Sequence, residues 1–459
     1  MIRHLMFLLV AGFFPALLFA QKSFTLQEAI DFGVAQSHEI KLKSLATEDA
    51  NAQIKEIRAF GMPKLNAGIN YQHFLAVPSQ PVQDFLGPTV YGILFKENVI
   101  PARDLGDPQT FKFTLFQPNT LSGNIELSSL LFDGSYLYGL KAARFYRELV
   151  AQEKNVSIQK IKEQVTKAYL SILIARENEK VLTKNMENLA ISLNDIKVMY
   201  QNGFAELLDV DRLQVSYDNL ETERNNIRQL VNISKNLLKF QMNYPLEDDI
   251  ELSQTLDQLL AEWNVAADGK NAGINYNERE EYKLLSLSQE LNKLDFKRVQ
   301  AGYYPSLRAF TSAQASLFRK NLFDTDETGW IPQSAVGLAM SIPIYDGGEK
   351  SAKLQRIRIN MQKADLEKAH FEKAMTMQIS NATIAYDNAK YRMESRKKAL
   401  DLNQRIYDLT LIKFKEGVGS SVEVIQSEGA LFRAQGDYTN AIYDMLGALI
   451  DLQSAKGTL

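Results

Sequence analysis

Two long stretches of the chain carry apolar residues at alternating spacings of three and four. They cover residues 135–244 and 348–452, and neither contains a proline. In the first, Ile158, Ile161, Val165, Ala168 and Ile172 form one such seam. This spacing places the side chains on one face of an α-helix, and proline inside a helix would cost about 3 kcal/mol. The pattern therefore predicts helices much longer than those of an ordinary globular domain.

A glycine interrupts each of these stretches, Gly203 in the first and Gly417 in the second. Glycine readily adopts the positive φ that a tight turn needs. Each stretch therefore predicts an antiparallel helical hairpin, with its tip near residue 203 or near residue 417. Arms of roughly 40–60 residues would be on the order of 60–90 Å long. Shorter helices are expected over residues 26–59 and 278–300.

Four other segments alternate between apolar and polar or small residues, near residues 64–74, 122–132, 306–316 and 334–344. In the first, Leu65, Ala67, Ile69 and Tyr71 form the apolar set, whereas Phe310 breaks the alternation in the third. Segments of about ten residues with one apolar and one polar face are typical of transmembrane β-strands. A soluble β-hairpin would show the same pattern, so the alternation alone leaves both possibilities open.

The elements occur twice in the same order, which indicates an internal duplication. Pro63 before the first strand corresponds to Pro305 before the third, and Gly203 corresponds to Gly417. The exits of the second and fourth strands also match, with the sequences Phe132-Asp133-Gly134 and Tyr345-Asp346-Gly347. The first copy is longer, and the extra residues fall in the stretch 73–118. This stretch is rich in proline and aromatic residues and is expected to form a large loop.

Four strands are too few to close a membrane barrel, which needs at least about eight. An open sheet edge in lipid would leave backbone polar groups without hydrogen-bond partners. If the four strands cross a membrane, several chains must therefore contribute to one barrel. Two chains would supply eight strands and three chains would supply twelve.

Composition excludes most catalytic and metal-binding functions. The 459 residues include no cysteine and only four histidines, and the formal net charge is −3. Disulfides, thiolate metal sites and a cysteine nucleophile are therefore excluded. The matches to S-x-x-K at Ser157–Lys160 and Ser395–Lys398 lie in helical seams, and the companion motifs of β-lactamases are missing. We expect no catalytic residue, no metal and no cofactor, so the chain is not expected to be an enzyme.

Residues 1–20 are typical of a secretory signal peptide. Arg3 precedes an apolar run over residues 5–19, and Ala20 precedes Gln21 at a plausible cleavage point. The alternative is a membrane anchor, but the run is shorter than the roughly 20 residues that a bilayer span needs. The sequence therefore predicts that the chain is exported.

The sequence resembles the TolC-type outer-membrane efflux channels. The resemblance rests on the export signal, the duplicated order of elements, the prolines before the strands (Pro63 and Pro305), the matched strand exits and the glycine tips. The resemblance implies an α+β membrane protein that forms a homotrimer. The trimer would have a 12-stranded β-barrel in the outer membrane and a 12-helix α-barrel tunnel in the periplasm. It also implies three partners of the trimer: outer-membrane lipid, a periplasmic adaptor (membrane fusion) protein, and an inner-membrane pump reached directly or through that adaptor. No nucleic-acid partner is expected.

The resemblance further implies how the chain divides. A first repeat would span 21–245, an equatorial linker 246–277 and a second repeat 278–459. The implied function is a passive exit duct of a tripartite efflux pump or a type I secretion system, for small molecules or polypeptides. The alternative is a secreted structural coiled-coil protein without channel activity.

Two sets of site residues follow from the resemblance. The tips that would contact the adaptor are Gly203, Phe204, Ala205 and Glu206 with Gly417, Val418, Gly419 and Ser420, although a plain turn would also explain the glycines. Asp209 and Glu423 lie six residues after the tip glycines and would line the periplasmic aperture. In a trimer they would form a ring of six carboxylates that favours cations, although acidic residues are also common at a solvated helix start. Three residues further along stand Arg212 and Gln426, and these would weaken the ring.

Overall fold

The structure is a computed structural model, and it describes residues 22–104, 106–107, 109–114, 116–266, 275–321, 323 and 329–459. The expected signal peptide, 1–20, lies outside the described residues. The chain forms two compact units. The first contains the residues up to Ala50 with Phe145–Glu290 and Met361–Leu459, and the second contains Asn51–Arg144 and Leu291–Asn360. These units draw on both halves of the chain, so they are a different division from the expected repeats, whose boundaries stay a prediction.

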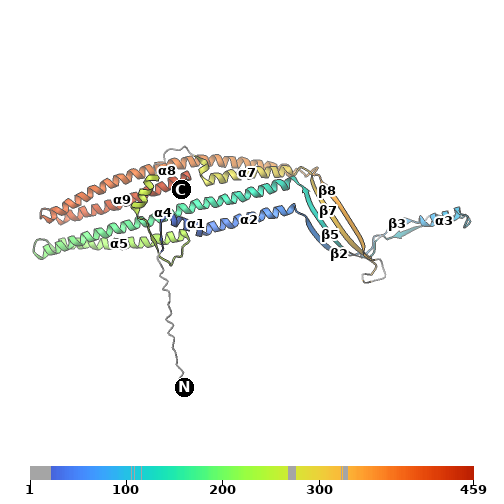
Figure 1. Cartoon of the computed structure of the whole chain (residues 1–459), viewed down its shortest axis with the longest axis horizontal. Helices are drawn as coiled ribbons and strands as arrows, with labels where there is room; N and C mark the ends of the chain where they lie inside the picture. The colour runs from blue at the N-terminus through green and yellow to red at the C-terminus, as the bar shows by residue number, and fades with distance from the viewer. Residues whose placement is uncertain are drawn as a thin grey trace, which may run out of the picture. The chain divides into compact units, whose positions relative to one another are not determined.

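Two long helical hairpins are present, as the apolar seams predict. Their arms are less equal than expected, with 68 and 36 residues in the first hairpin and 67 and 36 in the second. The first consists of α4 (Gly134–Gln201) and α5 (Leu207–Met242), and the second of α8 (Glu349–Lys415) and α9 (Ser421–Lys456). Figure 1 shows each pair running antiparallel from its turn. Within the first unit, Ile161, Val165, Ala168 and Ile172 of α4 are buried in one apolar cluster, which also contains Leu446 of α9. The seam is therefore the packing surface between helices.

Smaller elements complete the first unit. The strand β1 (Lys22–Phe24) pairs in parallel with β6 (Ile250–Leu252), and the helix α6 (Leu256–Ala266) follows. The expected single helix over 26–59 is divided into α1 (Leu26–Gln36) and α2 (His38–Phe60). The break falls at Ser37, whose ψ of 127° is not helical and whose hydroxyl accepts a hydrogen bond from the Ile40 N–H at 3.4 Å.

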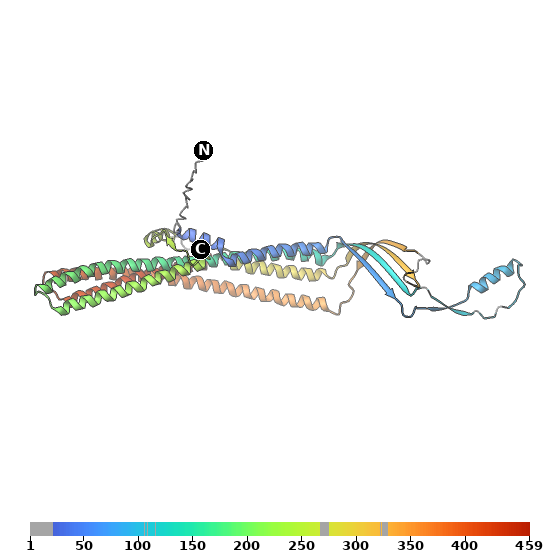
Figure 2. The same ribbon diagram turned by 90° about the horizontal axis from the view of Figure 1, so that it is seen from below.

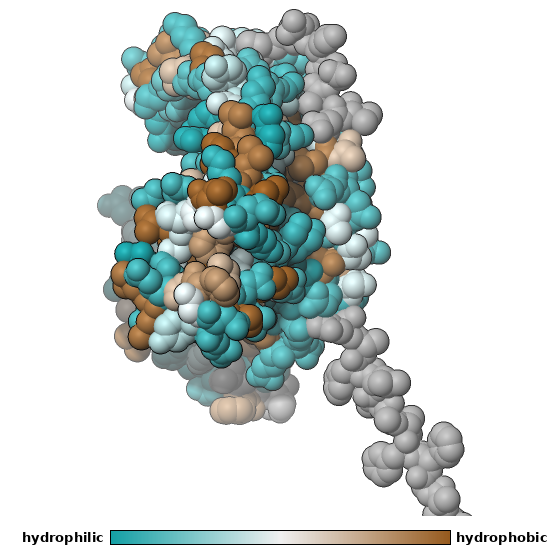
Figure 3. Space-filling model, turned by 90° about the vertical axis from the view of Figure 1, so that its left-hand side faces the viewer, coloured by the Kyte–Doolittle hydropathy of each residue, from teal (hydrophilic) through white to brown (hydrophobic). Residues whose placement is uncertain are grey.

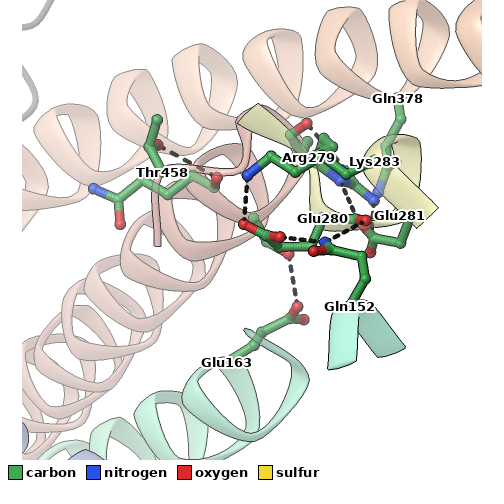
Figure 4. A network of polar contacts seen from close by, with 11 residues as sticks. Gln152, Glu163, Arg279, Glu280, Glu281, Lys283, Gln378 and Thr458 are labelled. Carbon is green, nitrogen blue, oxygen red and sulfur yellow. Dashed lines mark hydrogen bonds and ion pairs between the residues drawn. The ribbon is translucent and has the colours of Figure 1, made fainter. Parts of the chain in front are cut away.

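A polar joint holds the start of α7 (Glu280–Ala301), just after the short 3₁₀ helix η1 (Tyr276–Glu278), against three other helices (Figure 4). Arg279 donates to the Ala455 carbonyl of α9 at 3.1 Å and to Gln378 of α8 at 3.4 Å. Gln152 of α4 donates to the Glu280 carbonyl at 3.0 Å. At the end of α9, Gly457 has a φ of 79°, and a Cβ there would lie 2.7 Å from the Glu278 carbonyl oxygen. Only glycine therefore fits this crossing.

The second half of the same joint is an ion-pair network. Glu163 of α4 accepts from Ser454 of α9 at 2.7 Å and pairs with Lys167 at 2.7 Å. Lys167 also pairs with Asp451 of α9 at 2.7 Å. Burial works against ionisation of Glu163, but the hydrogen bonds from Lys167 and Ser454 outweigh it and hold its pKa below the ordinary value.

The second unit contains the four expected strands in one antiparallel sheet. The strands are β2 (Lys64–His73), β5 (Asn119–Phe132), β7 (Ser306–Arg319) and β8 (Ile331–Ser341), in the spatial order β2-β5-β7-β8. Figure 2 shows them as one twisted layer. The last strand ends at Ser341, earlier than the pattern suggests, because Pro343 offers no N–H to a neighbour and restricts Ile342 before it.

The register gathers the apolar residues on one face of the sheet. Leu65 lies opposite Leu127, and Thr311 lies between Leu127 and Val336. On the other face, Glu126 lies between Asn66 and Ser312. The alternation in the sequence thus corresponds to two faces of different polarity.

Phe310, which breaks the alternation, belongs to the polar face. It pairs with Gly337 of β8, and a Cβ on that glycine would lie 2.7 Å from the end of the Phe310 ring. The ring therefore covers the glycine, an arrangement that shields backbone otherwise left bare by a residue without a side chain.

All four connections to helices leave the same end of the sheet. The helices α2 and α7 lead into the starts of β2 and β7, and α4 and α8 follow the ends of β5 and β8. Because the strands are antiparallel, the opposite end carries the long insertion 74–118 and the connection between β7 and β8. Among the described helices, none has both the length and the apolar character that crossing a bilayer would require.

Candidate functional site

The first hairpin turn lies between the end of α4 at Gln201 and the start of α5 at Leu207. Gly203 has a φ of 79°, which a residue with a side chain would adopt only with strain. The Gly203 N–H donates to the Tyr200 carbonyl at 3.0 Å, and the Phe204 N–H donates to the Met199 carbonyl at 2.9 Å. These bonds satisfy carbonyls that the helix end would otherwise leave without partners. Gly203 therefore has a structural role in the turn.

The second turn repeats this geometry. Gly417 has a φ of 76°, and the Val418 N–H donates to the Lys413 carbonyl at 3.0 Å. The chain then passes close to the end of α8, because a Cβ on Gly419 would lie 3.1 Å from the Phe414 backbone nitrogen. Ser420 is the N-cap of α9, and its hydroxyl accepts a hydrogen bond from the Glu423 N–H at 3.3 Å. Ser420 thus also has a structural role.

Large apolar side chains stand exposed at both turns. Phe204 is 79% exposed and Val418 is 78% exposed, and neither is needed for the backbone geometry of its turn. Figure 3, which views the molecule from the tip end, shows hydrophobic residues among the hydrophilic ones there. Ala205, in contrast, packs against the apolar cluster between α4 and α5. Phe204 and Val418 are therefore the side chains of the two turns that a docking partner could bury.

Asp209 connects the two tips. The Ser421 hydroxyl, at the start of α9, donates to its Oδ1. The Glu206 N–H donates to its Oδ2 at 3.4 Å, and Arg212 lies 3.6 Å from the carboxylate. The carboxylate is thus held by local partners, and its charge is partly balanced by Arg212.

Glu423 and Gln426 lie together on an exposed face of α9. Both are exposed, and their separation of three residues places them one turn apart on the same face. The structure therefore brings Glu423 near Gln426, while Asp209 is brought to Ser421.

A buried carboxyl group that sequence reasoning missed lies on the opposite, buried side of α9. Glu428 of α9 is only 2% exposed, and its Oε2 has no hydrogen-bond partner among the described residues. Ser216 of α5 donates to the carboxyl, and Tyr407 of α8 lies close enough for the two to interact electrostatically. Burial raises the pKa of Glu428 to about 7, against the smaller opposing effect of the Ser216 hydrogen bond.

The sequence does contain a signal for this group. Val424, Glu428 and Leu431 follow the four-and-three spacing of an apolar seam, and both Val424 and Leu431 are buried. A charged residue at a seam position is expected to be buried with the seam. Tyr407 packs in the same cluster, and its hydroxyl is hydrogen-bonded with Ser192 of α4. All four hairpin helices thus meet around Glu428.

We predict that this carboxyl group makes the tips less stable as the pH rises. In the folded chain its pKa is about 7, whereas its ordinary value is 4.5. The folded state therefore binds the proton more tightly, and stability is highest below about pH 4.5 and declines as the pH rises through 7. The whole effect is about 3 kcal/mol. Thermal unfolding of the helices, followed by circular dichroism between pH 5 and pH 8.5, measures it.

Glu428→Gln keeps the shape of the side chain and removes the charge, so it should flatten this pH dependence and raise the unfolding temperature at pH 8.5. The control is Glu394→Gln, which neutralises an exposed carboxylate on α8 and should leave the wild-type dependence in place. An equal pH dependence in wild type and Glu428→Gln would mean that the buried carboxyl is not its source.

Comparison with known proteins gives consistent matches in sequence and in fold. The family described as "Outer membrane efflux protein" matches residues 289–458. The chain is 27% identical over 373 residues to outer membrane protein TolC of Escherichia coli (strain K12), covering 74% of this chain and 70% of that protein. It is 23% identical over 347 residues to the toluene efflux pump outer membrane protein TtgF of Pseudomonas putida, covering 74% and 68%.

Solved structures of similar fold include an outer membrane protein and an outer membrane channel from two bacteria. VceC of Vibrio cholerae superimposes with a TM-score of 0.65 at 14% identity, over 94% of this chain and 96% of that chain. The open state of MtrE from Neisseria gonorrhoeae gives a TM-score of 0.69 at 15% identity, over 94% and 88%. At these identities the solved structures show a shared fold only. The evidence for the family comes from the sequence matches.

Proposed function

We propose that this chain, which belongs to the TolC family of outer membrane efflux proteins, works as a trimer in which three copies close one β-barrel. Family membership makes the chain a non-enzymatic efflux channel of the outer membrane, with a helical extension in the periplasm and with pump partners. Family membership also argues against the alternative function, a secreted structural coiled-coil protein without channel activity. The number of copies, the adaptor surface and the aperture are the proposal.

The observation that carries the trimer is the sheet with two edges. Among the described residues, β2 pairs only with β5, and β8 pairs only with β7. In lipid these edges need partners, and the edge strands of neighbouring copies can supply them. In a sheet of four antiparallel strands the first and last strands run in opposite directions, so β8 runs opposite to β2. A pair formed by β8 of one copy and β2 of the next would therefore also be antiparallel. Three copies would give the 12 strands that the resemblance to this family implies.

The membrane orientation follows from the connections. The helices α2, α4, α7 and α8 all join the sheet at one end, so that end would face the periplasm, and the insertion 74–118 would lie outside the cell. The apolar face with Leu65, Leu127 and Val336 would face lipid, and the polar face with Asn66, Glu126 and Ser312 would line the pore.

The hairpin tips would dock the periplasmic adaptor protein. Phe204 and Val418 support this because they are large, apolar and almost fully exposed at the end of the hairpins. The inner-membrane pump would act directly or through that adaptor, and the channel itself would be a passive duct. Because the named relatives include a toluene efflux pump component, we favour efflux of small apolar molecules over secretion of polypeptides.

If the tips form the adaptor surface, a charge placed there should stop efflux without unfolding the channel. Phe204→Asp and Val418→Asp should each lower the resistance of cells to the pump's cargo at least tenfold, because a buried charge would have no partner at the docking surface. Trimer and outer-membrane level should stay normal. Ser420 is a poorer probe because it also caps α9.

Phe204→Leu and Val418→Leu are the matched controls, since they keep an apolar side chain at the same positions and should keep resistance. Resistance tests and quantification in isolated outer membranes measure both quantities. Full resistance of the two Asp variants at normal abundance would exclude the tips as the adaptor surface.

If Glu423 and Gln426 of α9 line the aperture, removing a charge and adding a charge there should have opposite effects. Glu423→Gln should lower the cation selectivity of single channels in planar bilayers, and Gln426→Glu should raise it, because a trimer would lose or gain three charges at the constriction. Asp209→Asn should change selectivity less, since Arg212 already balances that charge. Reversal potentials in a salt gradient measure selectivity, and unchanged values in both α9 variants would place the constriction elsewhere.

A further inference from the structure

The described part of the insertion in the first half has secondary structure and a hydrogen-bonded root. The Phe74 N–H donates to the Pro118 carbonyl at 2.7 Å, where the two arms leave β2 and β5. Next to it, the buried Asn119 accepts from the Tyr71 hydroxyl at 2.8 Å and donates to the Lys320 carbonyl at 2.8 Å. Further out, β3 (Gln80–Gln83) pairs with β4 (Thr110–Phe113), and between them lies the helix α3 (Leu86–Lys96). The expected loop therefore has secondary structure of its own.

The helix α3 carries an uncovered apolar stripe. Leu86, Val90 and Ile93 follow the four-and-three spacing of a helical seam, and each is more than half exposed. No residue of α3 is buried within the described part of the chain. The side near Tyr91 is partly covered, because its hydroxyl donates to the Pro101 carbonyl at 2.7 Å. The stripe lies on a different side.

This helix is too weak to be stable without a partner. It has 11 residues and contains Gly87, Pro88 and Gly92. Isolated helices shorter than about 12–15 residues are marginal in water even with good helix formers, and an isolated two-stranded hairpin is also marginal. The Asp84 carboxylate does hold the start, accepting from the N–H groups of Leu86 at 3.1 Å and Gly87 at 2.8 Å. The remaining stability must come from burial of the stripe.

We propose that the stripe Leu86–Val90–Ile93 packs against the same stripe of the other two copies, so that three α3 helices form an apolar cluster over the outer mouth of the channel. This inference rests on the proposed trimer. The insertion leaves the sheet from β2, which is the edge strand that would meet the neighbouring copy. The barrel interface and the α3 contact would therefore be continuous.

The distances permit this contact. Twelve strands about 4.8 Å apart, tilted by about 40°, give a barrel radius of about 12 Å. The arm from residue 74 to residue 85 has 12 residues and can reach about 40 Å when extended. Each α3 can thus reach the threefold axis. Lipid is a poorer occupant, because helices that lie on membranes are rich in lysine and arginine, whereas α3 contains Lys96 as its one cationic residue.

Because the chain has no cysteine, single cysteines report this contact directly. Val90→Cys and Ile93→Cys place a thiol on the stripe. Phe95→Cys is the control, since Phe95 is also exposed but lies on the opposite face of the same helix. The full-length variants are purified in detergent, their mass is measured, and they are then oxidised. Both stripe variants should give a covalent dimer within the trimer, at least tenfold more than the control.

The outcomes separate this inference from the trimer itself. Trimers in which the stripe variants cross-link no more than Phe95→Cys would overturn the α3 contact and leave the proposed function standing. A monomer before oxidation would overturn both. A nitroxide label on the thiol of the Val90→Cys variant in liposomes gives the third reading. If oxygen enhances the relaxation of the nitroxide but a water-soluble nickel chelate does not, the stripe lies in lipid. That result would also overturn the contact.

Discussion

The unpaired edges of a four-stranded sheet are the constraint on which this structure depends. Each edge strand presents backbone N–H and C=O groups that water can satisfy but lipid cannot. A membrane position for β2 and β8 therefore requires another chain at both edges. An even number of strands in each copy lets β8 of one copy pair with β2 of the next in the antiparallel sense. The four helices that adjoin the sheet directly, α2, α4, α7 and α8, do so at one end.

The tips are packed less extensively than the middle of the first unit, where the largest apolar cluster lies. Two small apolar clusters lie between the helices there, and the buried Glu428 falls in the sequence between Val424 and Leu431 of one of them. The two hairpins are joined by the contact of Ser421 with Asp209. At the polar joint of α7, by comparison, Arg279, Glu163 and Lys167 are each held by several partners. We therefore expect local opening to begin at the tips.

Local patterns in the sequence predicted most of the fold, because spacing along one helix or strand directly determines which residues share a face. The seam through Ile161 and Val165 and the alternation through Leu65 are of this kind, and so are the turns at Gly203 and Gly417. The duplication added the order of the elements, and the resemblance to a family added the function.

Contacts between residues distant in the chain could not be predicted in this way. The pairing of Asp209 with Ser421 joins two hairpins, and the covering of Gly337 by Phe310 depends on the register of β7 and β8. Burial of Glu428 is not expected from residue type, although it stands at a seam position, because a carboxylate is rarely buried without a partner. The helix in the insertion has no clear sequence signal because Gly87, Pro88 and Gly92 are typical of a loop.

The number of chains in one detergent-solubilised particle tests the central claim most directly. Mass measurement by light scattering, corrected for bound detergent, should give three chains, with the strand content retained in circular dichroism. That result would mean that neighbouring copies supply the hydrogen-bond partners of β2 and β8. A monodisperse single chain that keeps its full strand content would contradict it, because the sheet edges would then be stable in detergent without another copy.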